Sequence, residues 1–141
     1  MTSKSSRLFV PDGWPTVVPR LVADDAAGLV AFVRRVFGAR GRYQAERPSE
    51  MRIDDSVILI TQSGERKPVR AFLYVYVANS DAAYRRALAA GARSIEEPFD
   101  LPYGDRRCMV KDPWGNTWQI ATHLRSPRQK TAGRPRRRRP A

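Results

Sequence analysis

An internal repeat limits the fold of this chain more than any other feature of its sequence. Residues 22–44 and 77–97 each contain the end of a strand, a capping residue, an amphipathic helix and a Gly-Ala-Arg triplet that leads into another strand. Two copies of one supersecondary unit predict two modules of similar architecture. The chain has 141 residues, which suits one domain made of two such modules.

Both predicted helices have apolar residues at helical spacing. In the first helix, the positions i, i+3, i+4, i+7 and i+8 are Leu29, Phe32, Val33, Val36 and Phe37. The buried side of the second helix is formed by Tyr84, Ala87 and Leu88. This spacing places the apolar side chains of each helix on one buried side. The expected helix caps are Asp24 or Asp25 and Gly38 for the first helix, and Ser80 and Gly91 for the second.

Four strands are predicted around each helix. Strand 16–23 precedes the first helix, and strands 42–47, 50–53 and 56–61 follow it. Strand 71–77 precedes the second helix, and strands 93–98, 106–111 and 116–121 follow it. Asp54 and Asp55 predict one turn, and residues 112–116, which contain proline and glycine, predict another. The sequence therefore predicts an α+β fold of two βαβββ modules, 16–61 and 71–121, joined by a loop at 62–70.

Two segments, 18–39 and 102–123, resemble the vicinal oxygen chelate (VOC) superfamily, which includes glyoxalase I, bleomycin-resistance proteins and extradiol dioxygenases. Within the second segment, the Tyr-Gly-Asp-Arg run and the Lys-Asp-Pro-Trp-Gly-Asn-Thr-Trp run are similar to its PhnB-like branch. The resemblance covers residues 11–124. It implies a single domain, 16–124, in which the modules form a curled mixed sheet with a cleft, preceded by a lead-in at 1–15.

In enzymes of this superfamily, His, Glu and Gln side chains from four strands bind a divalent metal ion in the cleft. The resemblance places these positions at Val18, within residues 57–60, at Phe72 and at Gln119. Only Gln119 offers a donor atom, and a single donor does not hold a metal ion against water. We therefore expect no metal, no other cofactor and no catalytic residue. An enzyme with an atypical metal site made of Glu50, Gln119 and His123 remains the alternative.

The aromatic side chains of strand 71–77 indicate a ligand-binding surface in this cleft. Side chains alternate between the faces of a strand, so Leu73, Val75 and Val77 should face the helix. The residues expected to contact a ligand are Arg20, Phe72, Tyr74, Tyr76, Tyr103, Arg107 and Gln119, with Arg106 also at the mouth of the cleft. Aromatic rings and hydroxyls suit a planar, partly polar organic molecule. The alternative is that the aromatics fill a closed core or a dimer interface.

These residues lead to the hypothesis of a metal-free binding protein that acts in sequestration, resistance or sensing. The open sheet faces need a cover, so we expect a homodimer. The chain has a single cysteine, Cys108, and a single histidine. These counts exclude an intrachain disulfide and any site that needs two histidines or several cysteines. Cys108 lies on a predicted strand and is expected in the core.

The positive charge of the chain is concentrated in residues 125–141, which hold eight of the 26 basic residues and no acidic residue. Without this segment the net charge falls from +12 to +4, from 18 basic and 14 acidic residues. Three prolines and no large apolar residue predict a disordered tail. Residues 133–139 resemble an AT-hook, which implies DNA contacts by Arg134, Arg136, Arg137, Arg138 and Arg139. Weak non-specific binding of nucleic acid and a tail without function are the alternatives.

The sequence also predicts a cytoplasmic protein with no membrane partner. No apolar run approaches the length needed to cross a bilayer. The first residues lack the long apolar segment and the small-residue cleavage site of a secretory signal.

Overall fold

The computed structural model describes residues 7–124. The chain divides into two compact units, with the boundary between Val69 and Arg70, and each unit is described by itself. The predicted tail at 125–141, with its AT-hook-like arginines, lies outside the described residues, as do residues 1–6 of the lead-in. Within 7–124, no helix is both long enough and apolar enough to span a membrane.

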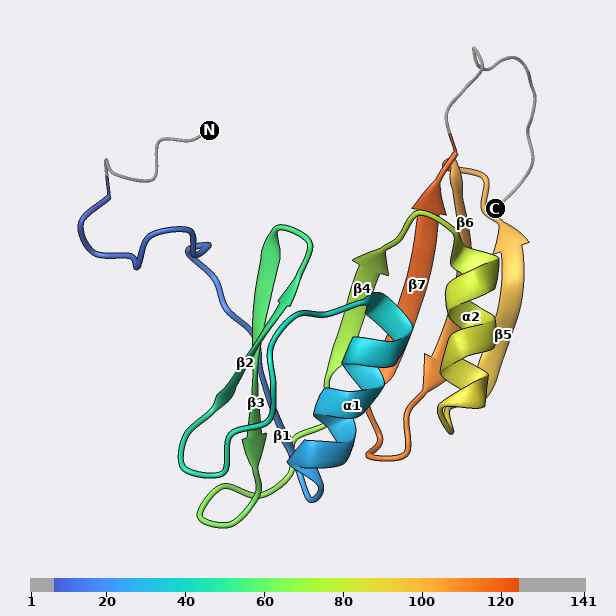
Figure 1. Ribbon diagram of the computed structural model, residues 1–141. Helices are drawn as coiled ribbons and strands as arrows, with labels where there is room; N and C mark the ends of the chain where they lie inside the picture. The colour runs from blue at the N-terminus through green and yellow to red at the C-terminus, as the bar shows by residue number, and fades with distance from the viewer. Residues whose placement is uncertain (1–6, 125–141) are drawn as a thin grey trace. The chain divides into compact units, whose positions relative to one another are not determined.

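The first unit is a three-stranded sheet with one helix (Figure 1). Its elements are β1 (Arg20–Ala23), α1 (Ala26–Phe37), β2 (Ser49–Ile53) and β3 (Ser56–Gln62). The strand order is β1-β3-β2, with β1 parallel and β2 antiparallel to β3. Asp25 caps α1 by accepting a hydrogen bond from the Gly28 amide, and Gly38 ends the helix at a φ of 68°. Both ends agree with the capping prediction, because a left-handed residue after a helix favours glycine.

The core of the first unit lies between α1 and one face of its sheet. The helix contributes Ala26, Leu29, Val30, Phe32, Val33 and Val36, all of them buried. The sheet contributes Leu21, Met51, Ile58 and Ile60, which are also buried. The predicted apolar spacing therefore identifies the helix side that forms the core.

The predicted strand at 42–47 is wrong. No residue of this segment lies in a strand, and an isolated bridge forms just before it, in which the amides and carbonyls of Arg40 and Arg52 exchange hydrogen bonds of 2.9 and 2.8 Å. At Gly41, with a φ of 132°, the chain passes so close to β2 that a side chain would collide with the Glu50 carbonyl. Beyond it, the Gln44 amide donates to the Ser49 hydroxyl at 2.8 Å instead of to a strand. The first unit is therefore a βαββ module.

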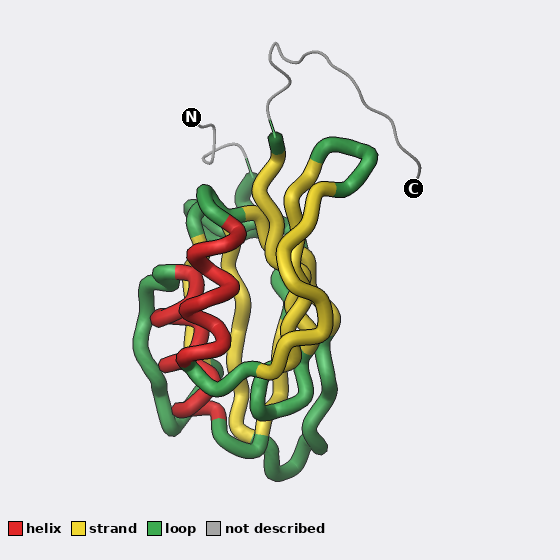
Figure 2. Tube along the Cα trace, turned by 90° about the vertical axis from the view of Figure 1, so that its right-hand side faces the viewer, coloured by secondary structure: helices red, strands yellow, loops and turns green. Residues whose placement is uncertain are grey.

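The second unit is a complete βαβββ module, as predicted. Its elements are β4 (Phe72–Tyr76), α2 (Ser80–Ala89), β5 (Arg93–Asp100), β6 (Asp105–Lys111) and β7 (Thr117–His123). The strand order is β4-β7-β6-β5, and only the β4–β7 pair is parallel. Helix α2 packs on β5, β6 and β7. Figure 2 distinguishes the helices from the strands along the chain trace.

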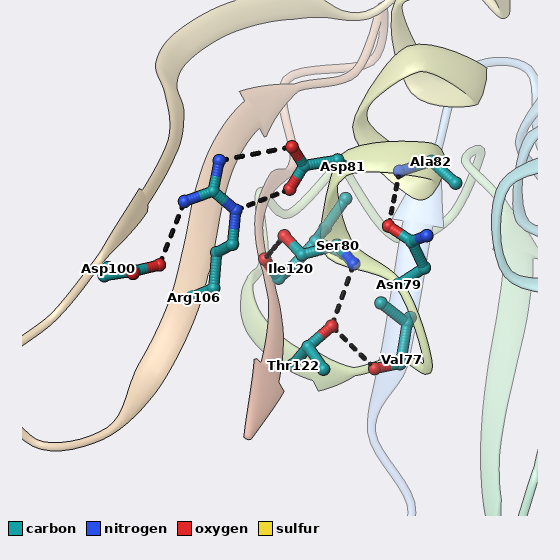
Figure 3. Close-up of polar contacts among 9 residues, drawn as sticks. All are labelled: Val77, Asn79, Ser80, Asp81, Ala82, Asp100, Arg106, Ile120 and Thr122. Carbon is teal, nitrogen blue, oxygen red and sulfur yellow. Dashed lines mark hydrogen bonds and ion pairs between the residues drawn. The ribbon is translucent and has the colours of Figure 1, made fainter. Parts of the chain in front are cut away.

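The cap of α2 differs from the prediction by one residue. Asn79 is the N-cap, and its side chain accepts a hydrogen bond from the Ala82 amide at 3.0 Å. The Ser80 hydroxyl instead donates to the Ile120 carbonyl on β7 at 2.9 Å, and the Ser80 amide donates to Thr122 (Figure 3). Ser80 therefore attaches the start of α2 to the sheet.

The turn at 112–116 is organised by a buried carboxylate. Asp112 is 3% exposed. One of its oxygens accepts from the Trp114 and Asn116 amides, and the other accepts from the Asn116 side chain and the Trp118 indole, all at 2.9 Å. The Asn116 side-chain oxygen in turn accepts from the Ala71 amide beside β4. The Asp112 carboxylate therefore stabilises the turn. The bond between Asn116 and Ala71 links the turn to the start of β4.

Candidate functional site: a tyrosine face around Asp105

The second sheet has one face toward α2, and the other face exposes aromatic side chains. Phe72, Tyr74 and Tyr76 on β4 are 65%, 38% and 59% exposed, whereas Leu73 and Val75 between them are half-buried. Gln119 lies opposite Tyr74 in the β4–β7 register. We call this surface, formed by Phe72, Tyr74, Tyr76, Tyr103 and Gln119, the tyrosine face.

Asp105, at the start of β6, holds the two central tyrosines. Its side chain is only 3% exposed. The carboxylate oxygen Oδ2 accepts hydrogen bonds from the hydroxyls of Tyr74 at 2.6 Å and Tyr76 at 2.8 Å. The other oxygen, Oδ1, lies 2.9 Å from Nδ1 of His123, the last residue of β7. Strands β4 and β7 thus bring polar groups to one carboxylate on β6.

These contacts keep Asp105 ionised. Burial by itself raises the pKa of Asp105, but the hydrogen bonds with Tyr74, His123 and Tyr76 outweigh it, and the pKa lies below its usual value. The pKa of Tyr74 is strongly raised, first by burial and then by its hydrogen bonds with Asp105 and Tyr103. The pKa of Tyr76 is raised as well, mainly by its hydrogen bond to Asp105. At neutral pH, the site therefore has a carboxylate anion and two protonated phenols.

Arg107 lies beside the tyrosine face and is occupied by local partners. Its guanidinium donates to the Tyr103 hydroxyl and to a Glu96 carboxylate oxygen, each at 3.2 Å. The same group lies 5.9 Å from the centre of the Phe99 ring. The charge of Arg107 is therefore balanced by Glu96, and its position fixes the side chain of Tyr103.

Arg106, expected at the mouth of the cleft, lies elsewhere. It faces α2, where it bonds Asp81 at 2.7 Å, and it also bonds Asp100 of β5 at 2.9 Å (Figure 3). The expectation that Arg106 lines the mouth of the cleft is wrong, because alternation along β6 puts it on the opposite face from Arg107. Arg20, also expected to contact a ligand, is exposed at the start of β1 in the first unit, opposite Leu59.

Asp105 was not predicted as a member of the site, and His123 was expected only in an alternative, atypical metal site. Alternation did contain a signal: residues 105 and 107 share a face of β6, and residues 119, 121 and 123 share a face of β7. The missing information was the strand register, which pairs Asp105 with His123. Cys108, in contrast, lies in the core as predicted, fully buried, and burial raises its pKa.

The first unit contains a pocket of about 310 Å³. It is lined by Trp14, Arg40, Gly41, Glu50, Met51, Arg52 and Val57. The lead-in reaches the sheet here, since the Arg52 guanidinium donates to the Gly13 carbonyl at 3.2 Å. Trp14 therefore lies against the sheet of the first unit.

The positions that the VOC resemblance assigns to a metal do not suit one. The register pairs Phe72 with Thr117 and Tyr74 with Gln119, so Gln119 has an aromatic neighbour on β4 and Met109 on β6. Among the residues that the structure describes, no three His, Cys, Asp or Glu side chains come together as a metal-binding group. Val18 and the apolar run at 57–60 supply no side-chain donor. We therefore derive no metal-dependent step.

The modules define an α+β protein with a glyoxalase-like fold, and comparison with known proteins gives the family. The family model described as the Glyoxalase/Bleomycin resistance protein/Dioxygenase superfamily matches residues 16–120. The chain belongs to this superfamily.

Three similar proteins illustrate the relationship. The uncharacterized protein Mb0911c of Mycobacterium bovis is 27% identical over 129 residues, covering 79% of this chain and 85% of that protein. TioX from Micromonospora sp. ML1 has a TM-score of 0.67 at 24% identity, with 78% of this chain and 99% of TioX covered. A glyoxalase/bleomycin resistance protein/dioxygenase family enzyme from Burkholderia phytofirmans PsJN has a TM-score of 0.65 at 20% identity, with 76% and 97% covered. At these identities, the two structures show a shared fold.

Proposed function

We propose that this protein binds a small organic molecule on the tyrosine face and acts without a metal ion, in sequestration, resistance or sensing. The observation that carries the proposal is the exposed Tyr74–Tyr76 pair, with both hydroxyls fixed on the buried carboxylate of Asp105. Large aromatic side chains at the surface of a folded domain are typical of binding sites.

The rigidity of the tyrosines supports this proposal. A flexible side chain loses rotamer freedom when a ligand orders it, and that loss weakens binding. Hydrogen bonds to an ionised group are stronger than those between neutral groups, so Asp105 orders both rings before a ligand arrives. A face prepared in this way suits reversible binding.

A screen of aromatic small molecules tests the proposal. Compounds that raise the melting temperature are titrated calorimetrically against the wild type, Tyr76→Ala and Tyr84→Phe. Tyr84 is the matched control, because it is a tyrosine of α2 whose hydroxyl bonds Ser94. We expect Tyr76→Ala to weaken binding about tenfold, in line with an aromatic contact of about 1.4 kcal/mol, and Tyr84→Phe to have no effect.

Two results would contradict the proposal: a screen without any hit, or hits whose affinity Tyr76→Ala leaves unchanged. Size-exclusion chromatography with light scattering of the same variants separates ligand binding from self-association. We also propose the homodimer expected from the sequence. If Tyr76→Ala turns a dimer into a monomer and no compound binds, the tyrosine face is a dimer interface.

A further inference from the structure

The hydroxyl protons of the tyrosine face point inward. A phenol has one proton to donate, and both Tyr74 and Tyr76 lie within 2.8 Å of the same oxygen of Asp105. An ionised carboxylate accepts hydrogen bonds and donates none. Both phenol protons are therefore committed to Asp105, and the two phenol oxygens offer only lone pairs to a ligand.

His123 also directs a ring proton toward Asp105 and an acceptor nitrogen away from it. Its Nδ1 lies 2.9 Å from Oδ1 of Asp105, so Nδ1 must carry the proton that it donates to the carboxylate. The histidine side chain is 68% exposed, and the other ring nitrogen, Nε2, faces away from Asp105. In a neutral imidazole, this nitrogen is a hydrogen-bond acceptor. A single buried carboxylate thus orients the two phenols, and the neutral form of His123, as acceptors.

The charge around the two tyrosine hydroxyls is negative, which also suits hydrogen-bond donors. Among the residues described, Asp105 makes no ion pair with a lysine or an arginine, and His123 is its only basic partner. The nearby cation Arg107 is paired with Glu96, and on the opposite face of the sheet Arg106 is paired with Asp81 and Asp100. The carboxylate therefore gives this end of the tyrosine face a negative character.

The arrangement of the rings favours a compact group over a flat one. The ring centres of Tyr74 and Tyr76 lie 5.3 Å apart, and the ring planes meet at 56°. A flat molecule can stack on only one of two rings inclined in this way. A rounded cation can contact both, and a cation is attracted to the face of an aromatic ring.

From these observations we infer that the tyrosine face recognises an organic cation with N–H donors, such as a protonated primary amine attached to an apolar group. The donors bond Tyr76, Tyr74 and Nε2 of His123, and the apolar group contacts the exposed ring of Phe72. This inference rests on the proposed function, and it replaces the planar, partly polar ligand expected from the sequence with a cationic one.

Four benzyl compounds that differ in a single group test the inference. Benzylammonium has charge and N–H donors, benzyltrimethylammonium has charge alone, benzyl alcohol is neutral, and benzoate is an anion. Each is titrated into ¹⁵N-labelled protein, and dissociation constants are taken from amide shifts of β4, β6 and β7. We expect benzylammonium to bind at least tenfold more tightly than benzyl alcohol and at least threefold more tightly than benzyltrimethylammonium, with no binding of benzoate.

Tyr76→Phe is the informative variant, because it removes one acceptor oxygen and keeps the ring. It should weaken benzylammonium severalfold and leave benzyltrimethylammonium unchanged, and Tyr84→Phe should affect neither. Equal or tighter binding of benzyl alcohol or benzoate would overturn the inference, and so would the absence of binding by both cations. The screen of aromatic small molecules tests the proposed function separately. Neutral or anionic hits whose binding depends on Tyr76 would support ligand binding on the tyrosine face and would refute the preference for a cation.

Discussion

At the scale of single residues, Asp105 explains why exposed tyrosines can form an ordered surface. Without the carboxylate, Tyr74, Tyr76 and His123 would be independent side chains at a sheet surface. With it, their polar groups meet within 2.9 Å of two oxygens. The buried anion therefore determines the orientation of the groups that we propose to contact a ligand.

Replacing Asp105 with asparagine should lower stability in a pH-dependent way. The pKa of Asp105 is lowered in the folded protein, so its ionised form stabilises the fold above the unfolded-state pKa of about 3.9. That contribution is lost as pH falls through the lower, folded-state value. We expect Asp105→Asn to cost about 1–3 kcal/mol at pH 7, and the difference from the wild type to shrink below about pH 4.

Urea denaturation at a series of pH values measures this effect. Asp55→Asn, at an exposed turn, is the control and should follow the wild-type pH profile. The pKa of Asp81 is also lowered, mainly by its hydrogen bond with Arg106, but this contribution is the same in all three proteins. A constant difference between Asp105→Asn and the wild type from pH 7 to pH 3 would contradict the assignment.

At the scale of elements, the two hairpin turns that contain aspartate differ in what they stabilise. Asp112 accepts four hydrogen bonds inside the second unit. At the turn between β2 and β3, Asp55 accepts one side-chain hydrogen bond, from Ser56 at the surface. The sequence predicted both turns but not which aspartate is buried. Burial of the Asp112 carboxylate depends on contacts with β7 and with the residue before β4, which are distant in sequence or set by the fold.

Truncating the two aspartates should reveal this difference. Asp112→Ala leaves buried donors, including the Trp118 indole, without their acceptor, and an unsatisfied buried donor costs about 1–3 kcal/mol. We expect Asp112→Ala to lower the free energy of unfolding by at least about 2 kcal/mol and Asp55→Ala by less than about 0.5 kcal/mol. Urea unfolding followed by tryptophan fluorescence measures both, and equal losses would refute the structural role of Asp112.

Most elements of the fold could be predicted from local patterns, and the exceptions have physical causes. Helical spacing and caps located α1 and α2, because those signals lie within a few residues of one another. The prediction of a strand at 42–47 was wrong because the Gln44 amide bonds the Ser49 side chain instead of a neighbouring strand, a contact that no local pattern contains. The Asp105–His123 contact could not be found, since it depends on the register between β6 and β7.

At the scale of the whole molecule, the protein is a member of the glyoxalase/bleomycin resistance/dioxygenase superfamily, and we propose that it binds its ligand without transforming it. The superfamily is shown by the match over residues 16–120. The proposal of binding without a metal rests on the apolar residues at the positions where related enzymes bind metal, and on the tyrosine face of the second unit.

Elemental analysis tests the metal-free part of this proposal. Purified untagged protein is measured by plasma mass spectrometry before and after incubation with nickel, zinc, manganese and ferrous iron, followed by desalting. We expect much less than one metal ion per chain in every sample, because three of the four expected positions lack a donor. A stoichiometric ion that is lost in Gln119→Ala would refute the metal-free proposal and direct the work to an enzyme assay.

The most direct test of the central claim is to map a bound ligand by NMR, using the tightest compound from the screen and ¹⁵N-labelled wild-type protein. We expect shift changes to centre on Tyr74, Tyr76, Asp105 and His123, and to require about tenfold more ligand in Tyr76→Ala. Shift changes confined to the first unit, around the pocket beside Trp14, would contradict the account and place the binding site there.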